Sequence, residues 1–105
     1  MTGKIVINVT CVNEAEATEI AKSLIINKLA ACVNIIPTVK SIYNWEEKMV
    51  TDTESLMIIK TKRDLFDQVK EAVIKMHSNQ VPEIISFPID QGSQKYLSFI
   101  DNNTK

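Results

Sequence analysis

The sequence predicts a single α+β domain in which strands and helices follow one another in the order β-α-β-β-α-β, with one more helix near the C-terminal end. Three observations predict this order. Apolar and polar residues alternate near the start, apolar residues recur at helical spacing in two later segments, and a long β-branched stretch lies between those segments. With 105 residues, 45% of them hydrophobic, residues 1–105 have the size and composition of one domain.

A change in the spacing of apolar residues separates the first predicted strand from the first predicted helix. Ile5, Ile7 and Val9 alternate with more polar neighbours, as in a strand with one strongly apolar face. Asn13 has the side chain of a helix N-cap, and Glu16 stands three residues on, as the partner in a capping box. The helix that follows is predicted to end near residue 29 or 30, with an apolar stripe of Ala17, Ile20, Ala21, Leu24 and Ile25.

A long extended segment, residues 31–45, comes after this helix. Its β-branched start stops at Pro37, which has no N–H for a strand ladder and so marks a bend or an edge position. Residues 46–52 are polar enough for a hairpin loop, and Leu56–Ile59 is apolar on both faces, as a central strand would be. This part of the chain is therefore predicted to be a hairpin that leads into the middle of the sheet.

The length of this hairpin indicates whether the protein forms an oligomer. At about 3.3 Å per residue the extended segment could span about 50 Å, whereas a compact domain of this size has a radius of gyration of about 13 Å. The hairpin must either fold back over its own sheet or project beyond its core. A projecting hairpin exposes Ile42, Tyr43 and Trp45 together with open strand edges, which soluble proteins usually cover with a partner. The sequence therefore favours an oligomer, without fixing the number of subunits.

The second half repeats the helix-then-strand order. Thr61, with Asp64 three residues later, predicts the cap of a second helix, whose end falls near residues 77–79. Pro82 opens the last strand. A short helix is predicted over residues 94–100. The side chains expected to face inward from that helix are Tyr96, Leu97 and Ile100.

Charge and cysteine content limit the classes of partner. The net charge is −1, from 12 basic and 13 acidic residues, so no basic excess draws the chain to nucleic acid or to anionic lipid. Cys11 and Cys32 are too few for a secreted disulfide framework and indicate two thiols in a reducing compartment. The apolar run at the start is too short for a signal peptide, and residues 29–36 cannot span a bilayer. We therefore expect a cytoplasmic protein with no membrane partner.

The element order is that of the split βαβ, or ferredoxin-like, arrangement, and several separate motifs resemble the CutA family of divalent-cation tolerance proteins. The matching segments are Leu29–Ile35, Ser41–Glu46, Glu54, Ile58–Thr61, His77, Val81–Ile85 and Tyr96–Ile100. The chain departs from the family pattern in three places. Ser78 and Asn79 stand where a Pro-Tyr pair is usual, Glu47 where a Gly is usual, and Phe99 where a Trp is common.

The resemblance implies a ferredoxin-like sandwich with a long central hairpin and a C-terminal helix, assembled as a homotrimer. It also implies a non-enzymatic role in tolerance of divalent metal ions, with no catalytic residues and no required cofactor. Copper, or a small ligand at the subunit boundaries, is the implied ligand. The alternative is a trimeric signalling or scaffold protein that binds a protein partner and has no physiological role with metals.

The candidate metal ligands each have a second, structural reading. Cys32 offers a thiolate, which favours copper(I) and zinc, but a free cysteine on a strand is more often a small buried hydrophobe. His77 offers a neutral imidazole, but near a helix C-terminus it can also serve the free carbonyls there. Two cysteines and one histidine cannot supply a four-ligand Cys/His zinc site. Carboxylates are therefore added as candidates, namely Glu54 and Glu83.

A second set of residues is predicted to form a subunit interface or a ligand cleft. Tyr43 and Trp45 could stack on a ligand, but burial at a subunit contact is the favoured use. Glu54 and Lys60 share a strand face about 20 Å apart, so each could meet a neighbouring subunit rather than the other; ordinary solvated charge is the alternative. Tyr96 completes the set.

Three other functions share this element order, and the residues argue against each. An RNA-binding module needs aromatic residues on the central strands, and Leu56–Ile59 has none. An acylphosphatase-like hydrolase needs an anion-cradling loop with arginine, and Arg63, the one arginine, follows no glycine-rich loop. A copper chaperone of this fold needs paired cysteines on the first loop, where Cys11 stands alone.

Overall fold

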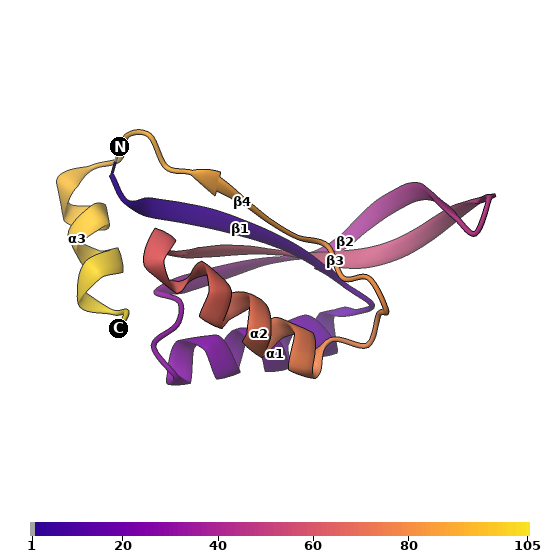
Figure 1. The fold of residues 1–105 in the computed structure, drawn as a ribbon, viewed down its shortest axis with the longest axis horizontal. Helices are drawn as coiled ribbons and strands as arrows, with labels where there is room; N and C mark the ends of the chain where they lie inside the picture. The colour runs from indigo at the N-terminus through magenta and orange to yellow at the C-terminus, as the bar shows by residue number, and fades with distance from the viewer. Residues whose placement is uncertain (1) are drawn as a thin grey trace.

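The computed structural model describes residues 2–105 and shows a four-stranded antiparallel sheet with two helices packed on one face (Figure 1). The strands lie in the order β2-β3-β1-β4, so the predicted ferredoxin-like β-α-β-β-α-β order with a final helix is confirmed. The elements are β1 (Lys4–Cys11), α1 (Glu14–Ile26), β2 (Cys32–Trp45), β3 (Lys48–Lys62), α2 (Phe66–Met76), β4 (Ile84–Pro88) and α3 (Gln94–Asn102).

The core lies between the sheet and the helices α1 and α2. Alternate residues of β1 point into it, and β3 is paired so that its own buried residues share that face, with Ile7 opposite Ile59 and Val9 opposite Met57. Because side chains alternate across a strand, this register places every second side chain of β1 and of residues 55–61 of β3 in the core. The core side chains with no exposed area include Ile7, Val9, Leu24, Met57, Ile59, Val69 and Val73.

Helix α1 begins as predicted and ends earlier than predicted. The Asn13 side chain accepts a hydrogen bond from the backbone N–H of Glu16 at 2.9 Å, which confirms the N-cap. The helix stops at Ile26 rather than near residue 29 or 30. Lys28 has a φ of +56°, and the chain turns back so that the N–H of Leu29 bonds to the carbonyl of Leu24. Burial of the leucine side chain ends the helix, because a continued helix would carry it away from the core.

The hairpin between β2 and β3 is longer and its turn tighter than predicted. Residues 46–52 were expected to form a loop, but the turn contains only Glu46 and Glu47, and Lys48 already pairs with Trp45. Both turn residues have positive φ, +51° and +66°, as in the type I′ turns whose twist matches paired strands. The register shifts between Ile36 and Val39, which places a bulge at Pro37.

The hairpin projects beyond the rest of the domain (Figure 1). The molecule measures 44 Å along its longest axis and 26 and 22 Å along the others. The strands therefore extend past the helices rather than folding back over them, and the apolar residues that they carry stay exposed: Ile42, Tyr43, Trp45 and Met49.

The predicted cap of the second helix is wrong. Thr61 belongs to β3, its side chain is buried, and its hydroxyl donates a hydrogen bond of 2.6 Å to the carbonyl of Leu29. The strand is followed by a short 3-10 turn, Arg63–Leu65, and α2 begins after it without a side-chain cap. Thr61 lies two residues after the core residue Ile59, so its side chain is on the core face of β3, and its hydroxyl is bonded to Leu29 rather than to the helix start.

The sheet face opposite α1 and α2 is only partly covered. Helix α3 lies near the end of the sheet where β1 begins (Figure 1). An ion pair of 3.1 Å joins Lys4 to Asp101. Ile100 is fully buried, as predicted, whereas Tyr96, predicted to face inward, is 41% exposed. Beyond α3 the face is apolar and open. The apolar residues that the register places on it are Val6, Ile36, Leu56, Ile58, Ile85 and Phe87, and Asn8, Asn34 and Lys60 lie among them.

Helices long and apolar enough to cross a bilayer are absent from residues 2–105.

Candidate functional site

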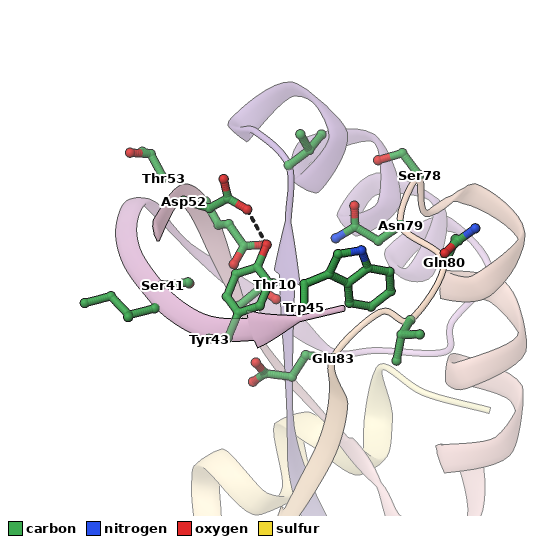
Figure 2. Close-up of a pocket in the computed structure, with 14 residues that line it drawn as sticks. Thr10, Ser41, Tyr43, Trp45, Asp52, Thr53, Ser78, Asn79, Gln80 and Glu83 are labelled. Atoms are coloured by element: carbon green, nitrogen blue, oxygen red, sulfur yellow. Dashed lines mark hydrogen bonds between the residues drawn. The ribbon is translucent and has the colours of Figure 1, made fainter. Parts of the chain in front are cut away.

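A cleft of about 710 Å³ opens where the projecting hairpin leaves the domain. One wall is the hairpin, and the opposite wall is the segment between α2 and β4. In Figure 2, Tyr43 and Trp45 project from the hairpin, and Ser78, Asn79 and Gln80 belong to that segment. The lining residues are Thr10, Val12, Ser41, Ile42, Tyr43, Trp45, Asp52, Thr53, Glu54, Ser78, Asn79, Gln80, Val81 and Glu83.

The cleft is acidic and aromatic. Three carboxylates line it, Asp52, Glu54 and Glu83, and the described lining residues include no lysine, arginine or histidine. The hydroxyl of Tyr43 donates a hydrogen bond to the carboxylate of Asp52 (Figure 2). This bond to a negative acceptor favours the neutral phenol and raises the pKa of Tyr43. Carboxylates beside aromatic faces suit a positively charged ligand.

Four of the residues predicted from the sequence meet in this cleft. Tyr43, Trp45, Glu54 and Glu83 all line it, although they come from two strands and a loop. Asp52 was missed, because the predicted loop over residues 46–52 hid its pairing with Ser41. A two-residue turn would have placed its side chain near Tyr43 on the neighbouring strand.

The other predicted interface residues lie at the far end of the sheet. Cys32 stands opposite Lys60 on the adjacent strand. Tyr96 from α3 lies close to Cys32, and burial together with the neighbouring thiol raises the pKa of Tyr96. Lys60 is paired with Val6, four residues before Thr10 at the cleft, which is about 13 Å along the strand. Within one chain, the predicted site residues therefore form two groups, one at the cleft and one at the far end of the sheet.

His77 lies beside the cleft, with both ring nitrogens in use. Its side chain has no exposed area. Nε2 lies 2.6 Å from the carbonyl oxygen of Thr10, and Nδ1 lies 3.1 Å from the backbone N–H of Asn79. A carbonyl can only accept and an N–H can only donate, so Nε2 carries the hydrogen and Nδ1 is the acceptor. The imidazole is neutral in this arrangement and fixes the start of the segment that walls the cleft.

Glu16 fixes the same segment from another side. One oxygen of its carboxylate accepts the N–H of Ser78 at 3.2 Å, and the other accepts the N–H of Val12 at 3.4 Å. The Oε1 atom also lies 3.9 Å from Nε2 of His77. The capping residue predicted for α1 thus also links the helix start to the cleft wall.

Cys11 lies close to His77 and Glu16 and forms a cluster with them. Its thiol is fully buried, donates to the sulfur of Met57 at 3.5 Å, and has its pKa raised by burial to about 12. Cys11, Glu16 and His77 offer ligand atoms that all lie within 4.8 Å of one another. Sequence reasoning named His77 but missed this cluster, because His77 is far along the chain from Cys11 and Glu16. The predicted soft ligand, Cys32, lies with Lys60 at the other end of the sheet.

Comparison with known proteins gives a consistent result over nearly the whole chain. The family described as CutA1 divalent ion tolerance protein matches residues 5–103. The chain is 45% identical over 101 residues to the chloroplastic protein CutA of Arabidopsis thaliana, covering 96% of this chain and 56% of that protein. This chain thus spans little more than half the length of its plant relative.

Two prokaryotic relatives match over nearly their full length. The chain is 42% identical over 99 residues to the divalent-cation tolerance protein CutA of Thermus thermophilus, covering 94% of this chain and 96% of that one. A solved structure, the periplasmic divalent cation tolerance protein CutA of Archaeoglobus fulgidus, is 40% identical. It superposes with a TM-score of 0.95, covering 97% of this chain and 99% of that chain.

Proposed function

Because the chain belongs to the CutA1 divalent ion tolerance protein family, we propose that it is a non-enzymatic homotrimer that supports tolerance of divalent metal ions, copper among them. The family match over residues 5–103 carries this proposal. The protein requires no cofactor in this proposal, since the metal ion is its ligand and not a resident catalytic group. We place it in the cytoplasm, where Cys11 and Cys32 would stay reduced.

Two surfaces of the single chain support assembly. The open sheet face presents Ile85 and Phe87, each 47% exposed, and the projecting hairpin presents Ile42, which is 62% exposed. Exposed apolar areas of this kind usually mark interaction sites. If the hairpin of one copy covers the sheet face of the next, the contact is heterologous, and it closes into a ring when the rotation between neighbouring copies is a whole fraction of a turn. The family resemblance sets the number of copies at three.

The cleft lies at the base of the same hairpin, so in such a ring it borders the neighbouring subunit. Its carboxylates, Asp52, Glu54 and Glu83, make that boundary attractive to cations or to a cationic small ligand. Cys32 and His77 are the soft ligands predicted from sequence. Because they occupy opposite ends of the sheet within one chain, a site that uses both would have to join two subunits.

Assembly is tested by light scattering and native mass measurement of the purified protein. We expect three times the chain mass of 11.8 kDa. Phe87→Glu, on the open sheet face, is expected to give monomers, because a buried charge without a partner opposes association. Ile74→Glu, at an exposed position on α2, is the matched control and should remain trimeric. A parent protein that stays monomeric at micromolar concentration would contradict the assembly.

The metal role is tested by titrating the metal-free protein with copper and zinc, and by growth of cells that lack the gene. We expect direct binding and increased copper sensitivity that the parent gene restores. A trimer that binds neither metal and restores no tolerance would favour the alternative, a scaffold that binds a protein partner.

A further inference from the structure

We propose that the cleft at the base of the hairpin binds a linear aliphatic polyamine, whose ammonium groups meet the carboxylates while its carbon chain lies on the rings of Tyr43 and Trp45. The proposal rests on the function above only in taking up the cationic small ligand named there, and it requires no metal. The cleft volume of about 710 Å³ is within the range of about 300–1,000 Å³ that is usual for small-molecule sites. The two rings are accessible in the single chain, with Tyr43 40% and Trp45 41% exposed.

The carboxylates of the cleft are available to a cation. Asp52, Glu54 and Glu83 form no ion pair within residues 2–105, and the described lining residues include no basic side chain. The hydroxyl of Tyr43 is bonded to Oδ2 of Asp52, whereas Oδ1 has no hydrogen-bond partner among the same residues. Because carboxylates gathered in one cleft without a counter-charge attract positive groups, the expected ligand is a cation.

The spacing of the carboxylates favours several separated charges over one ion. Asp52 and Glu54 lie two residues apart on β3, so their side chains share a face at a spacing of about 7 Å. Glu83 comes from the opposite wall, and Figure 2 shows it on the other side of Tyr43 from Asp52. In the part of the chain that the structure describes, these three carboxylates are not grouped closely enough to share a metal ion. Ammonium groups joined by short carbon spacers fit this distribution, because each can meet a different carboxylate.

The aromatic rings supply a surface for the hydrocarbon part of the ligand. Tyr43 and Trp45 lie two residues apart on β2, and both rings line the cleft (Figure 2). The methylene groups next to an ammonium group carry part of its positive charge, and an aromatic face offers them both apolar area and electrostatic attraction. The hydrogen bond from Tyr43 joins its ring directly to the carboxylate of Asp52. A cation at this carboxylate is therefore held beside the ring as well.

The opposite wall contributes neutral acceptors on a fixed backbone. The side-chain amides of Asn79 and Gln80 line the cleft, and their carbonyl oxygens can accept hydrogen bonds from an amine. The backbone N–H of Asn79 is bonded to the ring of His77 at 3.1 Å. That of Ser78 is bonded to the carboxylate of Glu16 at 3.2 Å. A wall held in this way loses little conformational freedom when a ligand binds, which favours affinity.

The single tryptophan gives a direct readout of the site. Trp45 is the one tryptophan of the chain and lines the cleft, so its fluorescence reports on this place alone. Spermidine is added to the intact, metal-free protein in its native assembly, and calorimetry measures its affinity. We expect a saturable change in Trp45 emission. Spermidine acetylated at both ends keeps the carbon chain but loses the two terminal charges, and it should bind at least about tenfold more weakly. A parent protein that binds no spermidine would overturn the proposal.

Variants that remove one charge locate the ligand. Asp52→Asn keeps an acceptor for Tyr43, and Glu83→Gln makes the matching change on the opposite wall. Each should weaken spermidine binding by about three- to tenfold, because the carboxylates are partly exposed. Asp90→Asn, at an exposed position outside the cleft, is the control and should leave the affinity unchanged. Equal weakening in all three variants would show attraction to the net charge of the protein and would overturn the site.

A parallel titration with copper separates this inference from the metal role. If the parent binds copper but no spermidine, the polyamine site is wrong and the metal role stands. If it binds spermidine at the cleft but no copper, the site stands and direct metal binding is contradicted. If it binds neither, both proposals fail.

Discussion

His77 and Thr10 are joined by a hydrogen bond of 2.6 Å between Nε2 of the ring and the backbone carbonyl, across 67 positions of the chain. The second ring nitrogen accepts the N–H of Asn79. One buried side chain therefore connects the end of β1, the end of α2 and the wall of the cleft. Its imidazole has no free lone pair until one of these bonds is broken.

Removal of this ring is expected to destabilise the fold. His77→Ala leaves a buried carbonyl without a donor and an unfilled volume, so we expect the free energy of unfolding to fall by about 2–4 kcal/mol. Urea denaturation measures this. Ser78→Ala is the control, since its side chain is exposed and its backbone N–H is retained; it should change stability by less than about 0.5 kcal/mol. Equal effects of the two variants would contradict the role given to the ring.

Trp45→Ala is expected to weaken assembly more than it alters metal binding. Large aromatic residues dominate the energetics of interfaces, and Trp45 stands on the projecting hairpin beside the cleft. Sedimentation at falling protein concentration should show dissociation at a concentration at least about tenfold higher than for the parent. Because the dissociation constant of a trimer scales with the square of concentration, this is a change of about 2.7 kcal/mol per trimer. Met49→Ala, at a more exposed position on the same hairpin, serves for comparison. A Trp45 variant with unchanged assembly and melting temperature would rule out the anchor role.

The buried thiol predicts a loss of stability in alkaline solution. Burial raises the pKa of Cys11 from 9.0 to about 12. Between these values the unfolded chain loses the thiol proton and the folded chain keeps it, so stability is full below pH 9 and declines as pH rises towards 12. The slope from this group is about 1.4 kcal/mol per pH unit. Denaturation of the parent and of Cys11→Ala at pH values from about 8 to 10.5 isolates this group. Parallel profiles would show that the thiol ionises as readily in the folded protein.

The turn at the tip of the hairpin predicts a stabilising change. Glu46 and Glu47 both have positive φ, which costs a residue with a side chain about 1–2 kcal/mol. Glu47→Gly should therefore raise the free energy of unfolding by about 0.5–1 kcal/mol, since glycine suits the second position of a type I′ turn. Lys48→Gly, one residue on and within β3, should instead lower stability. Thermal melting of the three proteins distinguishes the two effects.

Local patterns were enough for most of the fold. Alternation in Ile5, Ile7 and Val9 identified the buried face of β1, and the Asn13 cap fixed the start of α1, because both signals depend on near neighbours. The local patterns gave wrong predictions where a contact between residues distant in the sequence determines the local structure. Thr61 has the sequence context of a helix cap, but pairing with β1 turns its side chain into the core. Residues 46–52 are polar enough for a loop, yet pairing with β2 makes residues 48–52 part of a strand.

The sequence alone determined the family, the element order and four residues of the cleft, because motifs and periodicity are properties of short segments. Tertiary structure alone decided which of the predicted site residues lie close together. Tyr43 and Glu83 reach one cleft, whereas Cys32 is held at the far end by its register with Lys60. The packing of α1 and α2 against β1 brings Cys11 close to Glu16 and His77, because strand order and helix packing set distances that spacing along the chain does not encode.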